Sequence, residues 1–482
     1  MRALVLIHRW LGVAFCLLFA MWFASGMVMH IVPFPALVEN ERVAGLAPFS
    51  PQGVAVPPRD ALRLLEVHKA WRLRLVGISG TPVYISQRTD GTLAALDAHS
   101  GQPLVVNDAL ALASARMHAQ TRGLDYTRAT VVAPESHDQW TVPNGFDAHR
   151  PLYRVALGDA ADTHLYVSSV TGQVVLDTQR VERAWNWAGS VVHWIYPTAL
   201  RKHWSAWDTT VWWLSLVAMI GALTGTALGV VRMNRLRAAS MSPFSGWMKW
   251  HHLLGLGCAV FVLTWIFSGW LSMDHGRLFS RGAASYDDRM WIEGRALAVP
   301  DLPQWDGFAA PVREIEWFAF AGQVVMRVID GSGGRELLAG AQRTPWLTDA
   351  SIVAAARALG KSCTLARVDE VDAYAARAVA AGAPVYRIRC GETWYHIDGA
   401  DGRVIEKLDA SRRAYRWAYQ ALHTFDYPAL NARPGSPGWA ATAFLLVLLA
   451  ESVVVAGEAP GDRYPGGFRD LAFGMRFEEA RV

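Results

Sequence analysis

Eight of the 15 histidines lie near the ends of long apolar runs, where an ionisable side chain that faces other helices is a candidate for function. The eight are His8, His30, His193, His203, His251, His252, His275 and His423. An imidazole changes its charge near neutral pH and is the commonest metal ligand in proteins. This set therefore predicts metal or cofactor binding at the edges of a membrane.

Two pairs of these histidines recur at matching offsets. The motif H-x-x-L-G begins at His8 and again at His251, and Ser-Gly follows 17 residues after each of them. His193 and His423 each lie 21 residues after a glycine and six residues after a tryptophan. Several matches at fixed offsets predict that the chain consists of two duplicated halves.

Four apolar runs approach the length that crosses a bilayer, at about 10–32, 210–231, 253–273 and 439–457. Tryptophans cluster at their ends, as expected at the level of the lipid headgroups. The first run is too long for a signal peptide and is expected to be a retained anchor. Lys and Arg gather at the N-terminus, between the second and third runs, and in the C-terminal tail. The positive-inside rule then places both termini in the cytoplasm and the two long segments outside.

The expected fold is a membrane protein with four transmembrane α-helices in two parallel-duplicated halves and two large external α+β domains. The divisions are 1–32 for the first transmembrane helix, 33–186 for the first external domain, 187–237 for an interfacial histidine segment with the second transmembrane helix, 238–275 for the third transmembrane helix, 276–416 for the second external domain, 417–458 for the second histidine segment with the fourth transmembrane helix, and 459–482 for a cytoplasmic tail. Parallel halves imply a pseudo-two-fold axis along the membrane normal.

Local signals predict helices and tight turns in the external segments. Asn107 and Thr348 are expected to cap helices, and 58–69 has helical periodicity. Turns that end in glycine, at about 96–101, 170–172 and 398–402, are expected to join strands. The histidines near these turns are expected to lie at the surface or to have their hydrogen bonds satisfied. They are His99, His164 and His396.

Composition and cysteine use exclude several classes of protein. Charged residues make up only 18% of the chain and the net charge is +4, which excludes a nucleic-acid binder that relies on a large basic field. None of the four cysteines lies in C-x-x-C, which argues against zinc ribbons, iron–sulfur clusters and covalently attached haem c. Cys363 and Cys390 lie in polar sequence and are expected to be close enough to form a disulfide outside the cytoplasm.

Three patterns in a fixed order resemble one family. They are the span-opening H-x-x-L-G, the strand–turn pattern from Asp97 to Leu104, and the histidine segment before a span that ends in Leu223-Thr224-Gly225. Together they are similar to PepSY-associated transmembrane (PepSY_TM) proteins over nearly the whole chain. The resemblance implies a bacterial inner-membrane protein. Some members of the family are di-haem reductases of ferric siderophores that act in iron uptake.

Two b-type haems are then expected near the pseudo-two-fold axis. His8 and His251 begin spans from the cytoplasmic side and would hold an inner haem, and His193 with His423 would hold an outer haem. Two axial imidazoles favour electron transfer over oxygen binding. Alternative ligands are His252 at the inner haem and His30 or His275 at the outer one.

The expected function is reduction of a periplasmic ferric chelate, from which iron is released because Fe(II) is bound less tightly than Fe(III) by hard oxygen ligands. No G-x-G-x-x-G follows a predicted strand, so quinol or a partner protein must donate the electrons. Glu451 in the fourth run is either an acid at a helix end or a contact for a proton or quinol. The alternative function is a non-enzymatic membrane protein whose PepSY-like domains bind or restrain a periplasmic partner or peptidase.

Overall fold

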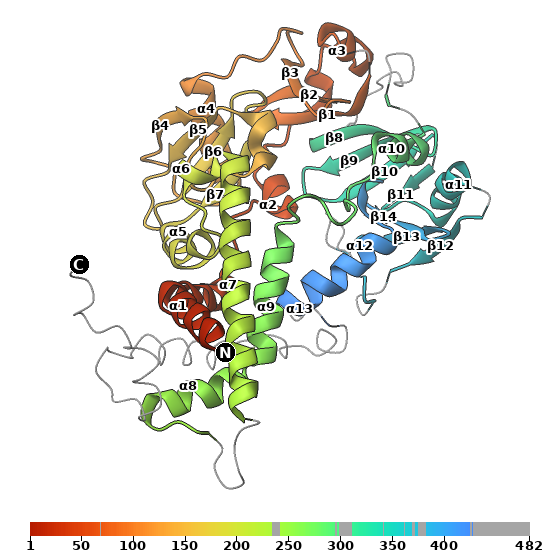
Figure 1. Cartoon of the computed structure of the whole chain (residues 1–482). Coiled ribbons are helices and arrows are strands. Elements are labelled where there is room, and N and C mark those ends of the chain that lie inside the picture. Colours follow the sequence, from red (N-terminus) through yellow and green to blue (C-terminus); the bar gives the residue numbers. More distant parts are fainter. Residues whose placement is uncertain are drawn as a thin grey trace. The chain divides into compact units, whose positions relative to one another are not determined.

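The computed structural model describes residues 1–67, 69–233, 242–294, 296–297, 311–340, 342–360, 362–368, 372–374, 382–424 and 427. The chain forms two units (Figure 1). The helical unit comprises Met1–Phe34, Trp185–Leu278 and the chain from Tyr415 onward. The sheet unit comprises Pro35–Ala184 and Phe279–Ala414.

The helical unit contains the candidate membrane spans. Within the described residues, α1 (Arg2–Ile31) and α7 (Trp204–Met233) are long and apolar enough to cross a membrane. A third candidate is the pair α8 (Gly246–Gly257) and α9 (Ala259–Ser272), bent by 63° where the two helices meet at Cys258. The apolar run expected at 253–273 is therefore divided by this bend, and it is a third span if the bent pair crosses the membrane as one. Gly255 and Gly257 precede the bend, and glycine weakens a helix. The fourth expected span, 439–457, lies outside the described residues.

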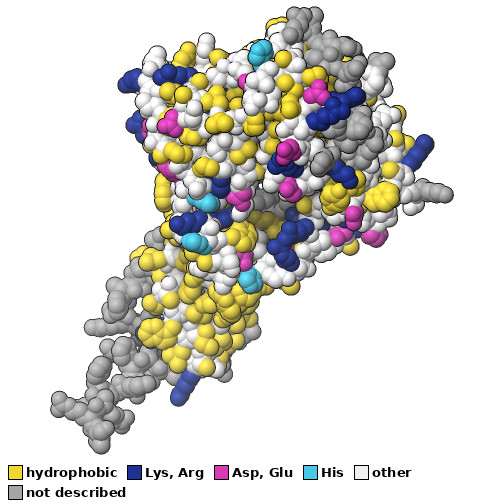
Figure 2. Space-filling model, turned by 90° about the horizontal axis from the view of Figure 1, so that it is seen from above, with side chains coloured by type: hydrophobic (Ala, Val, Ile, Leu, Met, Phe, Trp, Pro, Cys, Tyr) yellow, Lys and Arg dark blue, Asp and Glu magenta, His cyan; other side chains and the backbone are white. Residues whose placement is uncertain are grey.

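Helix α7 packs against both α1 and α9. Trp22, Ala218 and Ile266, one from each of these helices, form a buried apolar cluster. On the opposite faces large apolar side chains are exposed, among them Leu17 at 71% and Val260 at 67%. Figure 2 shows hydrophobic side chains gathered densely on part of the molecular surface. Helices that are apolar on their outer faces as well as their inner ones are typical of contact with lipid.

Seven antiparallel strands of the sheet unit form one sheet, in the order β11-β10-β9-β8-β1-β2-β3. The strands are β1 (Ala70–Ile78), β2 (Thr81–Arg88), β3 (Leu93–Asp97), β8 (Val312–Phe320), β9 (Gln323–Asp330), β10 (Arg335–Ala339) and β11 (Gln342–Thr344). Strand β1 pairs with β8, with Leu75 opposite Ile315. The segments 33–186 and 276–416, which the sequence predicts to be two external domains, thus contribute strands to one sheet. Both joining strands are buried on both faces, so neither suits an exposed edge.

Two further sheets have four strands each, in the orders β4-β5-β6-β7 and β12-β13-β14-β15. The strands are β4 (Thr130–Glu135), β5 (Leu152–Ala156), β6 (His164–Ser168), β7 (Val174–Thr178), β12 (Thr364–Arg367), β13 (Val385–Cys390), β14 (Thr393–Asp398) and β15 (Val404–Leu408). Helix α4 (Asp108–Thr121) packs on the first of these sheets, and α11 (Asp349–Leu359) packs on the second. The predicted caps are confirmed, because Asn107 accepts from the Leu110 N–H and Thr348 from the Ser351 N–H.

The remaining helices are short. They are α2 (Glu39–Ala44), η1 (Pro51–Gly53), α3 (Pro58–Leu64), η2 (Asn144–His149), α5 (Arg180–Asn186), η3 (Trp187–Val191), α6 (Thr198–Arg201), α10 (Tyr286–Glu293), α12 (Ala410–Tyr415), η5 (Arg416–Ala421) and α13 (Leu422–Thr424). The helix expected over 58–69 therefore ends early, at Leu64. The turns predicted at Gly172 and Gly402 are present, with φ of 68° and 72°.

The prediction for the two polar-region cysteines is confirmed. Cys363 and Cys390 form a disulfide with a Cα–Cα separation of 4.3 Å. The bridge joins the chain just after α11 to the end of β13. A disulfide in this part of the chain fits an oxidising compartment.

A buried network of charges supports the junction of β1 and β8. The carboxylate of Glu314, on β8, has no exposed surface and accepts hydrogen bonds of 2.7–2.8 Å from Arg42, Arg74 and Arg327. Burial alone would raise the pKa of Glu314, but the charges of the three arginines outweigh it and hold the pKa well below its usual range. Glu314 therefore stays ionised although it lies in the core.

Candidate functional site

His8 and His251, here called the first pair, lie side by side in the helical unit. Their ring centres are 6.2 Å apart and their planes differ by 20°. Nδ1 of His8, on α1, lies 3.2 Å from the backbone carbonyl oxygen of Gly221 on α7. A carbonyl oxygen only accepts, so Nδ1 carries the hydrogen and Nε2 keeps its lone pair. His8 is therefore held in the tautomer that binds a metal through Nε2.

Helix α7 leaves room for His8 by means of a glycine. A Cβ placed on Gly225 would lie only 2.5 Å from Cε1 of His8. The close approach of His8 thus explains why the Leu-Thr-Gly pattern ends in glycine, which the sequence alone did not show.

The neighbouring histidines His251 and His252 have different environments. Nδ1 of His251 is buried and has no hydrogen-bond partner among the described residues. His252 uses both nitrogens, because Nε2 donates to the Gly229 carbonyl at 3.2 Å and Nδ1 lies 3.0 Å from the Ser242 hydroxyl. Of the two, His251 is the one available as a ligand beside His8.

His193 and His423, here called the second pair, have ring centres 6.3 Å apart and planes that differ by 66°. Nδ1 of His193 lies 3.1 Å from the Trp22 carbonyl and 3.0 Å from the Ser25 hydroxyl. Because the carbonyl only accepts, Nδ1 of His193 is the donor and Nε2 carries the lone pair.

The second member of this pair is held in an equivalent way. Nδ1 of His423 lies 3.0 Å from the Ser268 hydroxyl on α9. That hydroxyl already donates to the Trp265 carbonyl at 3.1 Å, so it accepts from His423. The two imidazoles of the second pair therefore both present Nε2 as the unprotonated nitrogen.

The repeated Ser-Gly sequence holds these two rings. Ser25 and Ser268 bond to Nδ1, and the next residue in each case is a glycine. A Cβ on Gly26 would lie 3.4 Å from Cε1 of His193, and one on Gly269 would lie 3.4 Å from Cε1 of His423. The serine orients the ring and the glycine leaves space for it. The sequence showed the repeat but not this role.

Each member of the second pair also follows a π-helical turn, η3 before His193 and η5 before His423. Such turns are rare and are found mostly at functional sites. Their side chains differ, however. Gly189 of η3 faces Val28 of α1, whereas Tyr419 of η5 stacks on His423 with ring centres 5.5 Å apart.

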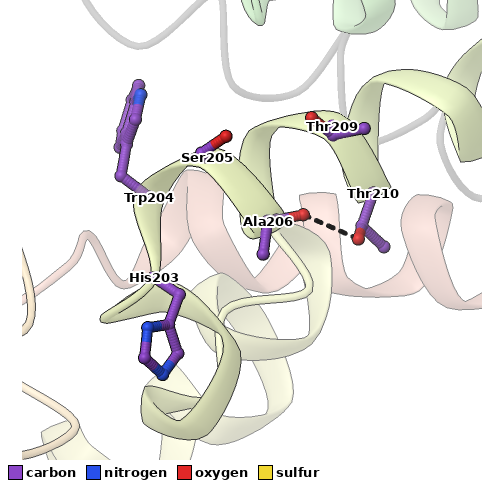
Figure 3. Close-up of a pocket in the computed structure, with 6 residues that line it drawn as sticks. All are labelled: His203, Trp204, Ser205, Ala206, Thr209 and Thr210. Carbon is purple, nitrogen blue, oxygen red and sulfur yellow. Dashed lines mark hydrogen bonds between the residues drawn. The ribbon is translucent and has the colours of Figure 1, made fainter.

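Three other candidates are not part of either pair in the described structure. The side chain of His30, near the end of α1, lies outside the described residues. His275 has its Nδ1 2.6 Å from a carboxylate oxygen of Asp208. His203 lines a shallow hollow at the start of α7 (Figure 3). The ring of His203 and that of Trp204 extend in opposite directions there, and Thr210 donates to the Ala206 carbonyl. The hollow contains no member of the two pairs.

Of the three histidines near the turns, His99 and His164 agree with the expectation, whereas His396 is only half satisfied, because its Nδ1 is buried without a hydrogen-bond partner among the described residues. His396 is buried and its Nε2 accepts from Nε of Arg387 at 2.8 Å. Burial and the neighbouring Arg387 charge lower the pKa of His396 to about 4, so it is neutral at physiological pH. His99 is exposed, and His164 lies 3.5 Å from a carboxylate oxygen of Asp162.

The two pairs limit the chemistry that this site can perform. Among the described residues, no group of three or more His, Cys, Asp and Glu side chains is arranged to hold a metal ion. Each pair supplies two imidazoles, which is the number of axial ligands that a six-coordinate haem iron can take from a protein.

Comparison of the chain with protein-family models, with curated proteins and with solved structures found no match.

Proposed function

We propose that the protein is a di-haem transmembrane electron-transfer protein that reduces a ferric chelate outside the cytoplasm. The observation that carries this proposal is the presence of two histidine pairs with ring centres 6.2 and 6.3 Å apart, together with the hydrogen bonds that hold Nδ1 of His8, His193 and His423. The first pair would hold one haem b and the second pair would hold another.

The spacing of the rings fits two axial ligands of one metal ion. A metal–imidazole bond is about 2 Å long, and a five-membered ring with bonds of about 1.33 Å has a radius of about 1.1 Å. Two imidazoles on opposite sides of one ion therefore have ring centres about 6.3 Å apart. Both measured separations agree with this value to about 0.1 Å.

The surrounding residues provide hydrogen bonds and a dry environment of the kind that metal-ligating imidazoles need. The Gly221 and Trp22 carbonyls and the Ser268 hydroxyl accept from Nδ1, which fixes the ring orientation and raises the basicity of Nε2. The buried cluster of α1, α7 and α9 excludes water from between the two pairs. A haem with two axial imidazoles supplies one-electron transfer.

The pairs lie at two levels of the helical unit. Ser25, which contacts the second pair, is 17 residues after His8 on the same helix, or about 25 Å at 1.5 Å per residue. The hydrocarbon core of a bilayer is about 30 Å thick. Two centres at this spacing would carry electrons across most of the membrane.

The finer layout forms part of the same proposal: four spans in two duplicated PepSY-like halves, both termini in the cytoplasm and the second pair on the periplasmic side of a bacterial inner membrane. Equivalent Ser–His contacts, equivalent π-helical turns and four-stranded sheets of equal order support the duplication. Quinol or a partner protein would supply the electrons, and a ferric complex of hard oxygen ligands would accept them.

The test uses the full-length protein purified in detergent and supplied with haem. The wild type should show a Soret band and two reducible b-type haems. His8→Ala and His251→Ala should each remove one haem and leave the other reducible by a small external reductant. His423→Ala should remove the other haem and stop reduction of the external ferric complex. His252→Ala is the matched control and should keep both haems, because both of its nitrogens already have partners.

Two results would redirect the proposal. If the supplied wild type shows no Soret band, the haem function is wrong, and binding of a periplasmic partner by the sheet unit becomes the function to test. If His423→Ala keeps two low-spin haems while His30→Ala loses one, His30 replaces a member of the second pair.

A further inference from the structure

A carboxylate–histidine dyad lies in the helical unit, apart from both pairs. Oδ2 of Asp208, on α7, lies 2.6 Å from Nδ1 of His275, in the chain just after α9. A carboxylate accepts, so Nδ1 of His275 donates and Nε2 is the reactive atom. The His275 side chain is 40% exposed whereas Asp208 is 15% exposed, so the imidazole can meet a solute while its partner stays protected.

Aromatic rings fix the position of the His275 imidazole. Trp212 packs on it with ring centres 5.1 Å apart and planes inclined by 37°. Trp212 in turn contacts Trp270 of α9 at 5.7 Å. From α7, Asp208 faces the imidazole with a charged group and Trp212 faces it with an uncharged ring. Asp274 and Arg277 flank His275 along the chain.

The dyad is built on the same elements that hold the second pair. Trp207, the neighbour of Asp208, donates from Nε1 to the carbonyl of Trp194 at 3.0 Å, and Trp194 directly follows His193. His275 comes seven residues after Ser268, which bonds to His423. The dyad thus lies near the second pair on the protein side where the proposed function places the ferric chelate.

We infer that His275 is the proton donor for reduction of the ferric chelate, an inference that rests on the proposed function. One electron from the haem that the second pair would hold converts the Fe(III) of the chelate to Fe(II), and an iron–oxygen bond of the chelate breaks. The proton moves from Nε2 of His275 to the oxygen that is released. His275 is left neutral and takes a new proton from water. Protonation of the oxygen prevents it from binding iron again. Asp208 holds the imidazole through its Nδ1 hydrogen, which leaves Nε2 as the nitrogen that exchanges the proton.

The test compares two electron acceptors with the reduced, haem-loaded full-length protein. A ferric trihydroxamate complex must gain a proton to release its iron, whereas ferricyanide accepts an electron and needs no proton. His275→Gln should lower the rate with the trihydroxamate about 100-fold, within the range of general acid catalysis, and leave the rate with ferricyanide unchanged. Asp208→Asn should act in the same direction. Added imidazole should restore part of the rate in His275→Gln.

A matched control and three further outcomes complete the test. His203→Gln changes a histidine at the start of α7 that is not part of the dyad, and it should leave both rates unchanged. An unchanged trihydroxamate rate in His275→Gln would overturn the inference. An equal fall with both acceptors would also overturn it, because it would assign His275 to structure or to electron transfer. A wild type that reduces neither acceptor would reject the proposed function itself, which is a separate failure.

Discussion

The close contact between Gly225 and His8 allows the first pair to be disrupted with one methyl group. In Gly225→Ala the new Cβ would lie 2.5 Å from Cε1 of His8 and 3.0 Å from its Nδ1. Carbon atoms in contact prefer about 3.5–4.0 Å, so the ring must move by about 1 Å. That movement stretches the 3.2 Å contact between Nδ1 and the Gly221 carbonyl to about 4 Å, beyond a hydrogen bond.

The expected result is selective loss of the first haem. Functional groups must be held to within about 0.5 Å, and losing an orienting partner typically lowers metal affinity 10–100-fold. Helix α7 itself should not suffer, because alanine is better than glycine in a helix by about 1 kcal/mol. Haem content per protein and the reduced-minus-oxidised spectrum would measure the change, and the second haem should keep its full absorbance.

Two other glycine variants serve as controls. A Cβ on Gly12, one turn after His8 on the same helix, would meet nothing within 4 Å, so Gly12→Ala should keep both haems. Gly269→Ala brings a Cβ to 3.4 Å from His423, which a small adjustment accommodates, so it should weaken the second haem only slightly. Two fully occupied haems in Gly225→Ala would refute the placement of His8 beside α7.

Three further predictions concern the stability and spectroscopy of the full-length protein. Glu314→Gln removes the carboxylate that Arg42, Arg74 and Arg327 share, but Arg42 keeps Glu39 and Arg327 keeps Glu316. The variant should therefore cost about 3 kcal/mol in denaturant unfolding, the lower end of the range for a broken buried ion pair, whereas Glu336→Gln, at an exposed pair with Arg343, should cost less than about 1 kcal/mol. Because the folded pKa of Glu314 lies below its unfolded value of 4.5, its contribution is complete above pH 4.5 and lost as the pH falls through the folded pKa, so wild type and variant should converge in acid. A thiol reagent should label two of the four cysteines in unfolded protein before reduction and all four after it, and reduction of the bridge, whose cysteines are 27 residues apart, should cost about 3–4 kcal/mol. Electron paramagnetic resonance should show two different low-spin signals, because the ring planes of the two pairs differ by 20° and 66°, and identical signals would contradict these orientations.

The sequence predicted that His8 lies beside His251 and His193 beside His423, since residues at matching offsets in two duplicated halves would meet near a common axis. It also predicted the helix caps at Asn107 and Thr348, since these depend on a few neighbouring residues. It did not predict that β1 pairs with β8, because contact between strands more than 200 residues apart leaves no local pattern. Nor did it separate His251 from His252, since the partners of His252 lie on α7 and in the chain before α8.

For the same reason, the sequence did not predict the dyad of Asp208 and His275. A histidine near the end of a span gives no sign of its partner, so the sequence offers His275 only as an alternative ligand at the outer haem. Asp208 lies among tryptophans at the start of α7, where an acid is readily explained by contact with water. Only the packing of α7 against α9 brings the two side chains to 2.6 Å.

Under the proposed duplication, the halves agree where two ligands of one ion must agree and differ elsewhere. Both members of the second pair have a serine on Nδ1, a glycine beside Cε1 and a π-helical turn before the histidine. Apart from these three features, the surroundings of the two histidines differ, because His423 packs on Tyr419 where the first half has Gly189. A purely structural pair of histidines would not require matched orientation on both sides. Two ligands of one ion do require it, because each must direct Nε2 at the same point.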